Sequence, residues 1–242
     1  MSSERGGFTA TRVELHRVAA HILARRRHDV SGRFGLRPSP GGFATPAFGE
    51  GPEVIRVADG TLVREAGGGA SYLPLAGASL RQLAELAEVD LDAEFSVGEE
   101  TPPLGDKDAP LTLDQGALEA IADWFSIGAR ALDTVLAELP ATAEPAVVQL
   151  WPEHFDLGTH VGDGPSRRVN LGVSPGDSHY DEPYLYVGPW SDERPGDAAY
   201  WNAAFGAVHL AGQLRRDSAL DDAAEFFRVG LRGLALLRET AS

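Results

Sequence analysis

The chain has 242 residues, 43% of them apolar, and its formal net charge is −15. This acidic balance argues against non-specific nucleic-acid binding and against docking on an anionic membrane, because both need an excess of basic residues. The absence of cysteine excludes disulfides, thiolate nucleophiles and cysteine-type zinc sites.

The N-terminal residues contain no apolar signal segment, and no apolar run approaches the ~20 residues of a membrane span. We therefore expect a cytoplasmic protein. Lys107 is the single lysine and lies in a predicted loop. Schiff-base and P-loop chemistry are accordingly disfavoured.

The N-terminal half alternates helices with short strands. An apolar stripe predicts a helix over residues 11–27, with Thr11 and Glu14 in capping-box spacing and His16 and His21 at its surface or boundary. A strand is predicted at 30–38. The segments 53–57 and 61–65 flank Ala-Asp-Gly and predict a hairpin, the glycines at 67–69 predict a flexible loop, and 79–89 predicts a short helix.

The C-terminal half begins after an acidic, proline-containing stretch at 96–110, the best candidate for a division of the chain. A long amphipathic helix is predicted at 114–139, followed by strands at 147–160, 167–174 and 183–190. Helices are predicted at 198–215 and 220–238. We expect one α+β domain over residues 1–242, with a mostly antiparallel sheet and helices on one face. The alternative is a looser division near residues 96–110, with two similar halves that share one sheet.

One internal similarity supports that alternative weakly. RFGLRPSPG at 33–41 and RVNLGVSPG at 168–176 share five residues at the same spacing, and each predicts a strand that runs into a type II turn. Either the chain contains a duplication, or the same turn chemistry is used twice.

Polar side chains gather on one face of the predicted C-terminal strands. Even spacing in LWPEHFDLGTH places His154, Asp156 and His160 on the same side of one strand. Glycines lie among these positions and would leave room above the sheet. The candidate ligand-binding residues on this face and at the strand ends are Asn170, Tyr184, Tyr186, Trp151 and Trp190.

Three interpretations of this face stay open. In the first, a small organic molecule binds here, and His154 and Asp156 are a catalytic or hydrogen-bonding pair. In the second, His154, Asp156 and His160 hold a divalent metal (Zn, Fe or Mn) as a two-histidine, one-carboxylate enzyme site. His179 and His209 are alternative third ligands. In the third, the pair is structural, and the face is an interaction surface or a homo-oligomer interface.

The segment from residue 150 to 190 resembles a family of bacterial proteins without an assigned activity. The landmarks are LWPEHFDL and SPGDSHYDEPYLYVGPW. The resemblance implies a recurrent domain type and carries no catalytic residue with it. The preferred prediction is a small-molecule-binding protein with its site around His154 and Asp156; whether it is an enzyme stays open, and no reaction is assigned.

Overall fold

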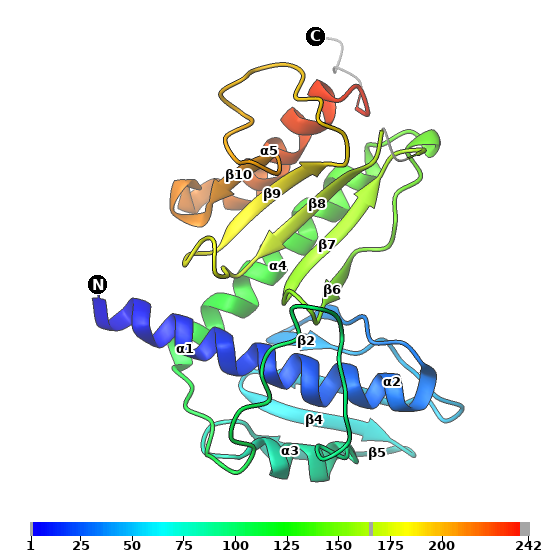
Figure 1. Ribbon diagram of the computed structural model, residues 1–242, viewed down its shortest axis with the longest axis vertical. Coiled ribbons are helices and arrows are strands. Elements are labelled where there is room, and N and C mark those ends of the chain that lie inside the picture. Colours follow the sequence, from blue (N-terminus) through cyan, green and yellow to red (C-terminus); the bar gives the residue numbers. More distant parts are fainter. Residues whose placement is uncertain (1, 165–166, 238–242) are drawn as a thin grey trace. The chain divides into compact units, whose positions relative to one another are not determined.

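The computed structural model describes residues 2–164 and 167–237, and it confirms an α+β fold with two five-stranded antiparallel sheets (Figure 1). The chain divides into two compact units. The first comprises residues 1–123 and 150–155, and the second comprises 124–149 and 156–242. The predicted division at 96–110 therefore does not coincide with the observed boundaries, which follow residues 123, 149 and 155.

The first unit opens with one continuous helical segment. Its parts are α1 (Ser2–Val18), a π-helical turn (Ala19–Ala24) and α2 (Arg25–Ser31). Gly32 ends the segment in the left-handed conformation, with φ 68°. The predicted capping box at Thr11 and Glu14 was wrong, because the helix begins before Thr11. The Thr11 hydroxyl instead accepts a hydrogen bond from the Asp114 amide at 2.9 Å.

The first sheet is a simple meander in which each strand pairs with its sequence neighbours. Its strands are β1 (Arg37–Ser39), β2 (Gly42–Ala44), β3 (Val54–Ala58), β4 (Thr61–Ala66) and β5 (Gly69–Pro74). The predicted hairpin is confirmed as β3 and β4. The predicted glycine loop was wrong in part, since Gly67 and Gly68 adopt positive φ and make a tight turn into β5. Helix α3 (Leu80–Ala87) follows, and Ser79 and Gln82 form the predicted capping box.

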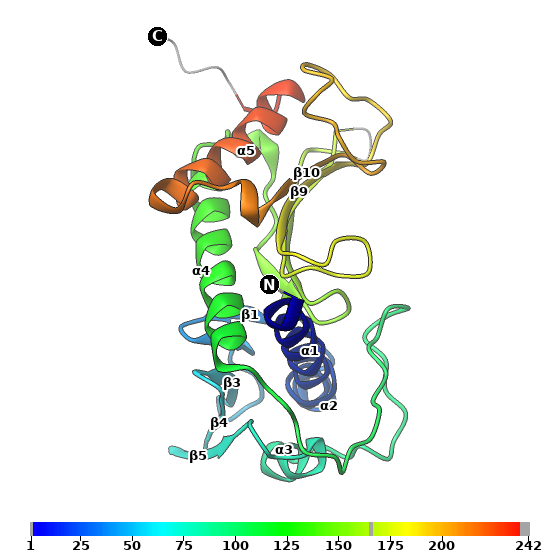
Figure 2. The ribbon, with the colours of Figure 1, turned by 90° about the vertical axis from the view of Figure 1, so that its left-hand side faces the viewer.

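The second sheet is also a meander, with the order β10-β9-β8-β7-β6. Helix α4 (Gln115–Ala137) precedes it along the chain, and α5 (Ala219–Gly233) follows it. The strands are β6 (Gln149–Trp151), β7 (Asp156–Val161), β8 (Val169–Ser174), β9 (Tyr184–Pro189) and β10 (Ala207–Leu210). Short 3-10 turns occupy Ala141–Ala143, Ala211–Gln213 and Arg216–Ser218. Figure 2 shows α4 and α5 on the same side of β9 and β10.

The helices cover the apolar face of the second sheet, as the alternation predicted. Its inward residues are fully buried: Leu157, Val169, Leu171, Val173, Leu185 and Val187. Helix α4 approaches closely because it presents Gly128, where a Cβ would lie 2.5 Å from Val173 Cγ1. Helix α5 does the same with Gly230, where a Cβ would lie 3.1 Å from Val187 Cγ1. Glycine therefore sets how closely the two helices pack on the sheet.

The predicted helix at 198–215 was wrong, because these residues form turns and the strand β10. Asn202 bonds both backbone groups of Val208, at 2.8 and 2.9 Å, and so supports the strand start. At Gly206, φ is 155° and a Cβ would collide with the Val187 carbonyl. The alanine-rich composition favoured a helix, but pairing with β9 satisfies the backbone instead.

The two repeated turn sequences stand at different places in their sheets. RFGLRPSPG contains β1, the first strand of its sheet, whereas RVNLGVSPG contains β8, the third strand of the second sheet in chain order. Both glycines have positive φ, 72° at Gly41 and 100° at Gly176. The two segments therefore share a turn conformation but do not occupy equivalent strands. No helix in the described part of the chain is long and apolar enough to cross a membrane.

Two histidines of the first helical segment are more buried than the sequence suggested. His16 bonds the Pro152 carbonyl at 2.9 Å, and His21 bonds the Pro102 carbonyl at 2.7 Å. The His16 ring also stacks on Phe155. Burial lowers the pKa of His16 from 6.5 to about 4, against the opposing effect of its carbonyl bonds, and burial lowers the pKa of His21 as well.

Acid should therefore destabilise the protein in a defined pH window. Between pH 6.5 and about 4 the unfolded chain protonates His16 and the folded chain does not. The stability that neutral His16 contributes is fully present above pH 6.5 and is lost as the pH falls through this window. The free energy of unfolding should fall by about 2–3 kcal/mol from this cause. Urea unfolding from pH 7 to pH 4.5 measures this slope. His16→Gln should flatten it, and the exposed His28→Gln should not; equal slopes in all three proteins would contradict the assignment.

Candidate functional site

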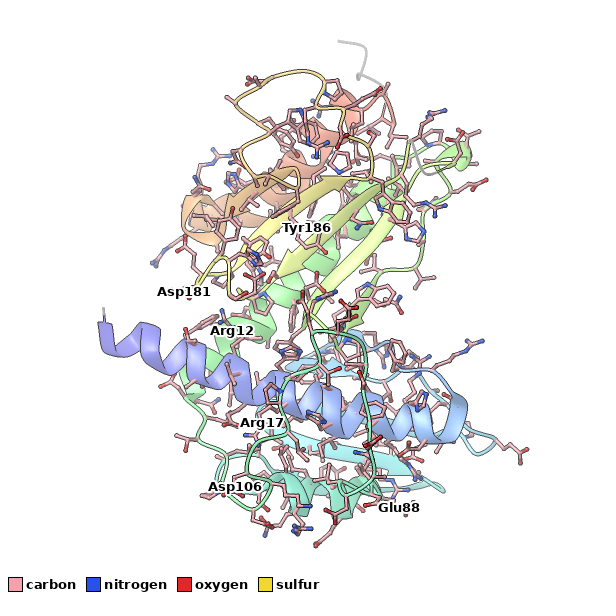
Figure 3. All side chains as sticks on the ribbon, viewed as in Figure 1. Arg12, Arg17, Glu88, Asp106, Asp181 and Tyr186 are labelled. Carbon is pink, nitrogen blue, oxygen red and sulfur yellow. The ribbon has the colours of Figure 1, made fainter. Side chains whose placement is uncertain are left out.

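The polar residues of the second sheet do share one face, opposite α4 and α5. Strand register places His160 against Asn170 and Ser174 against Tyr184. Tyr186 stands opposite Gly172, and Figure 3 labels its side chain on the face turned toward the viewer. We call this surface the outer face. It carries Asp156, His160, Arg168, Asn170, Ser174, Tyr184, Tyr186 and Gly188, with Trp190 at its end.

His154 does not lie on a strand of the second sheet. The predicted strand at 147–160 is broken between β6 and β7, because residues 152–155 form a turn in which Phe155 has φ 55°. The unit boundary also falls between Phe155 and Asp156. His154 and Trp151 thus belong to the first unit, where His154 Nδ1 lies 3.0 Å from a Glu100 carboxylate oxygen. The even spacing on which the His154–Asp156 pair was predicted is lost.

Asp156 instead pairs with Tyr186. The Tyr186 hydroxyl donates a 2.6 Å hydrogen bond to Asp156 Oδ2, and both groups belong to the second unit. Burial, and after it the charge of Asp156, raises the pKa of Tyr186 well above 10. The phenol therefore stays protonated and acts as a donor.

The ring of Tyr186 fills the space that the glycines were predicted to leave open. A Cβ at Gly172 would overlap Cζ, Cε1 and the hydroxyl of Tyr186. The ring thus lies directly across β8, and only glycine at position 172 permits this arrangement. Over Gly172 the sheet therefore carries a phenol ring rather than a cavity.

The end of the outer face near the loop at 175–183 is closed by internal hydrogen bonds. The Tyr184 hydroxyl donates to Asp177 at 2.5 Å, while the other oxygen of Asp177 accepts the amides of His179 and Tyr180. Tyr180 packs against Tyr184 with ring centroids 5.0 Å apart. Burial and the bond to Asp177 raise the pKa of Tyr184. These contacts stabilise the loop, as expected for a structural role.

The opposite end of the outer face presents an exposed tryptophan in a fixed orientation. The Trp190 indole donates a 2.9 Å hydrogen bond to Asn170 Oδ1, and the Arg168 guanidinium lies 5.0 Å from the ring centre. The His160 ring centroid lies 6.3 Å from that of Trp190. Despite these contacts, 52% of Trp190 is exposed. Three neighbours therefore orient a ring of which about half stays in contact with solvent.

Phe205 adds a second exposed aromatic ring. It is 43% exposed, and its ring packs edge-on against Tyr186. A Cβ at Gly188 would lie 4.0 Å from both the Phe205 ring and Asn170 Cβ, so Gly188 lies between these two residues. We call the group at this end the Trp190 surface: His160, Arg168, Asn170, Gly188, Trp190 and Phe205.

The sequence nominated His160, Asn170 and Trp190 but missed Arg168 and Phe205. Arg168 follows the same two-residue alternation as Asn170, and this pattern could have identified it. Phe205 comes from the connection between β9 and β10 that was predicted as helix, so no pattern pointed to it. Burial and the charge of Arg168 lower the pKa of His160, which favours a neutral imidazole on this surface.

The metal interpretation finds no support. Within residues 2–164 and 167–237, no three His, Asp or Glu side chains are grouped so that they could hold a metal ion. The suggested set of His154, Asp156 and His160 depended on one uninterrupted strand, which the turn at 152–155 breaks. His209 lies on β10 and packs against Phe226, and His179 is exposed beside Asp177.

Comparisons of the chain with protein-family models, with curated proteins and with solved structures found no match. The resemblance noted for residues 150–190 stays an expectation. The functional argument rests on the residues of the Trp190 surface.

Proposed function

We propose that this protein binds a small organic molecule at the Trp190 surface. The observation that carries the proposal is the half-exposed indole of Trp190, which Asn170 and Arg168 hold in one orientation. The Asn170 bond fixes the indole while about half of the residue stays exposed to solvent. An oriented exposed ring is suited to stacking against a planar ligand.

The surface also offers groups that would define the ligand's orientation. Asn170 uses its oxygen for Trp190, so its amide nitrogen remains as a donor. His160 offers one donor and one acceptor when neutral. Phe205 would supply a second apolar contact beyond Gly188. We assign no reaction, since the nearby carboxylates Asp156 and Asp177 already accept tyrosine hydroxyls.

Binding of an uncharged aromatic probe tests this proposal. We expect N-phenyl-1-naphthylamine to gain fluorescence on titration with the protein. Trp190→Ala should weaken its binding roughly tenfold, because truncation of a central aromatic contact typically costs more than 1 kcal/mol. Tyr72→Ala is the matched control, since Tyr72 is an exposed aromatic residue (65%) on β5 in the first unit, and it should bind like the wild type.

Equal binding by Trp190→Ala and wild type, or no binding by either, would overturn the proposal. Sedimentation of both proteins over a range of concentrations tests the competing interpretation, in which the Trp190 surface is a subunit interface. A wild-type dimer that Trp190→Ala abolishes, without any probe binding, would instead identify the Trp190 surface as a subunit interface.

A further inference from the structure

In the described part of this acidic chain Arg168 forms no ion pair, and the same holds for Arg33, Arg130 and Arg216; Arg168 differs from these three by its place over the ring of an exposed tryptophan. Several others form ion pairs: Arg26, Arg64, Arg81, Arg215, Arg228 and Arg232. Arg17 and Arg194 donate to backbone carbonyls. Among the described residues, Arg168 has neither a carboxylate within 4.0 Å nor a carbonyl acceptor for its guanidinium.

The guanidinium of Arg168 is nevertheless held in place. Its central carbon lies over the Trp190 ring, 5.0 Å from the ring centre, and the Trp190 amide donates to the Arg168 carbonyl at 2.9 Å, which joins the two backbones. Its Nε is buried without a hydrogen-bond partner, whereas neither terminal nitrogen is among the buried, unpartnered atoms. The terminal nitrogens are therefore the donors that remain for a ligand beside the Trp190 ring.

The neighbouring side chains on the Trp190 surface are donors or neutral groups. Asn170 offers its amide nitrogen, and burial and Arg168 together favour a neutral His160. The nearest acidic side chains along the chain do not neutralise Arg168: Asp163 pairs with Arg167 at 3.3 Å. Asp192 and Glu193 follow Trp190 but form no ion pair with Arg168. This donor set would favour an anionic group placed beside the Trp190 ring.

We propose that the ligand of the Trp190 surface is a planar organic monoanion, whose carboxylate pairs with Arg168 while its ring stacks on Trp190. This inference rests on the proposed function and specifies its ligand class. A planar guanidinium matches a carboxylate with two parallel hydrogen bonds. The net charge of −15 disfavours polyanions such as nucleic acids, so a small ligand with one negative charge fits best.

Two probes that differ only in charge test the inference. 1-Naphthoate and 1-naphthamide share the same ring system, and calorimetry gives the Kd of each. We expect the wild-type protein to bind naphthoate at least about fivefold more tightly than naphthamide, because charge-assisted bonds are the stronger ones. Added NaCl should reduce this preference. Arg168→Gln should bind the two probes equally. Arg168→Lys should keep part of the preference, because lysine keeps the positive charge but lacks the two parallel donors of the guanidinium.

Arg167→Gln is the matched control, since Arg167 is an exposed neighbour already paired with Asp163, and it should keep the full preference. Thermal unfolding of each variant verifies that it is folded. Equal affinity of the wild type for both probes, or a preference that survives in Arg168→Gln, overturns the inference. If both probes bind equally and both are lost in Trp190→Ala, the proposed function stands and only the ligand class is wrong. If neither probe binds, the inference is overturned. Binding of N-phenyl-1-naphthylamine then tests the proposed function by itself.

Discussion

Gly172→Ala is expected to destabilise the second unit by about 3 kcal/mol, through overpacking and the loss of a hydrogen bond to a carboxylate. The added methyl group would overlap the Tyr186 ring. The ring would have to swing away from β8, and its 2.6 Å bond to Asp156 would be lost. In a chain of this size we expect thermal unfolding at a temperature lower by roughly 6–12 °C.

A double-mutant cycle separates this cause from a general intolerance of alanine in β8. Tyr186→Ala removes the ring, so adding Gly172→Ala to that variant should cost well under 1 kcal/mol, in the range of ordinary backbone effects. Tyr186→Phe isolates the hydrogen bond and should cost about 1.5–3 kcal/mol. If Gly172→Ala is as costly without the Tyr186 ring as with it, the overlap is not the reason for the glycine.

Glu53→Gln should have the second large effect, and it concerns the first unit. The Glu53 carboxylate is 8% exposed and bonds two arginines, Arg26 at 3.0 Å and Arg64 at 2.9 Å. Removing its charge leaves both guanidinium groups, each 16% exposed, without their buried counter-ion. Both arginines keep their bonds to Glu88. We therefore expect a loss of about 1.5–3 kcal/mol in the free energy of unfolding, the range for a hydrogen bond to a charged group, measured by urea titration.

The same cluster supplies a matched control in Glu88→Gln. Glu88 bonds the same two arginines, at 2.9 and 2.7 Å, but it is 57% exposed. Solvent screens such a pair, so this variant should lose less than about 1 kcal/mol. The two glutamates share the same arginine partners and differ in how far their carboxylates are buried. Similar losses for Glu53→Gln and Glu88→Gln would show that burial does not decide the strength of these ion pairs.

Local patterns predicted much of the secondary structure correctly. The Ala-Asp-Gly turn gave β3 and β4, the 3.6-residue stripe gave α4, and the capping box at Ser79 gave α3. Each of these signals lies within a short stretch of chain, so that stretch alone is sufficient to predict the element. Alternation in β8 and β9 likewise identified the inward, apolar face of the second sheet.

The candidate site was predicted only in part, because the residues that were placed wrongly or missed are positioned by contacts between segments far apart in the sequence. Alternation is valid only while a strand continues, and the turn before Asp156 leaves His154 outside the strand. Glycine at position 172 indicated empty space, but a side chain from the next strand occupies it. Phe205 was missed because pairing of β10 with β9 overrides the helical preference of an alanine-rich segment.

By itself, the sequence determined the α+β class, the apolar face of the second sheet and the presence of Asn170, Trp190 and His160 on its outer face. Those features follow from periodicity, which residue types and backbone geometry set locally. Only the tertiary structure decided that Asp156 pairs with Tyr186, that Tyr186 covers Gly172, and that Arg168 lies over the Trp190 ring. These contacts join different strands, and their free energy depends on distances that no single stretch of sequence contains.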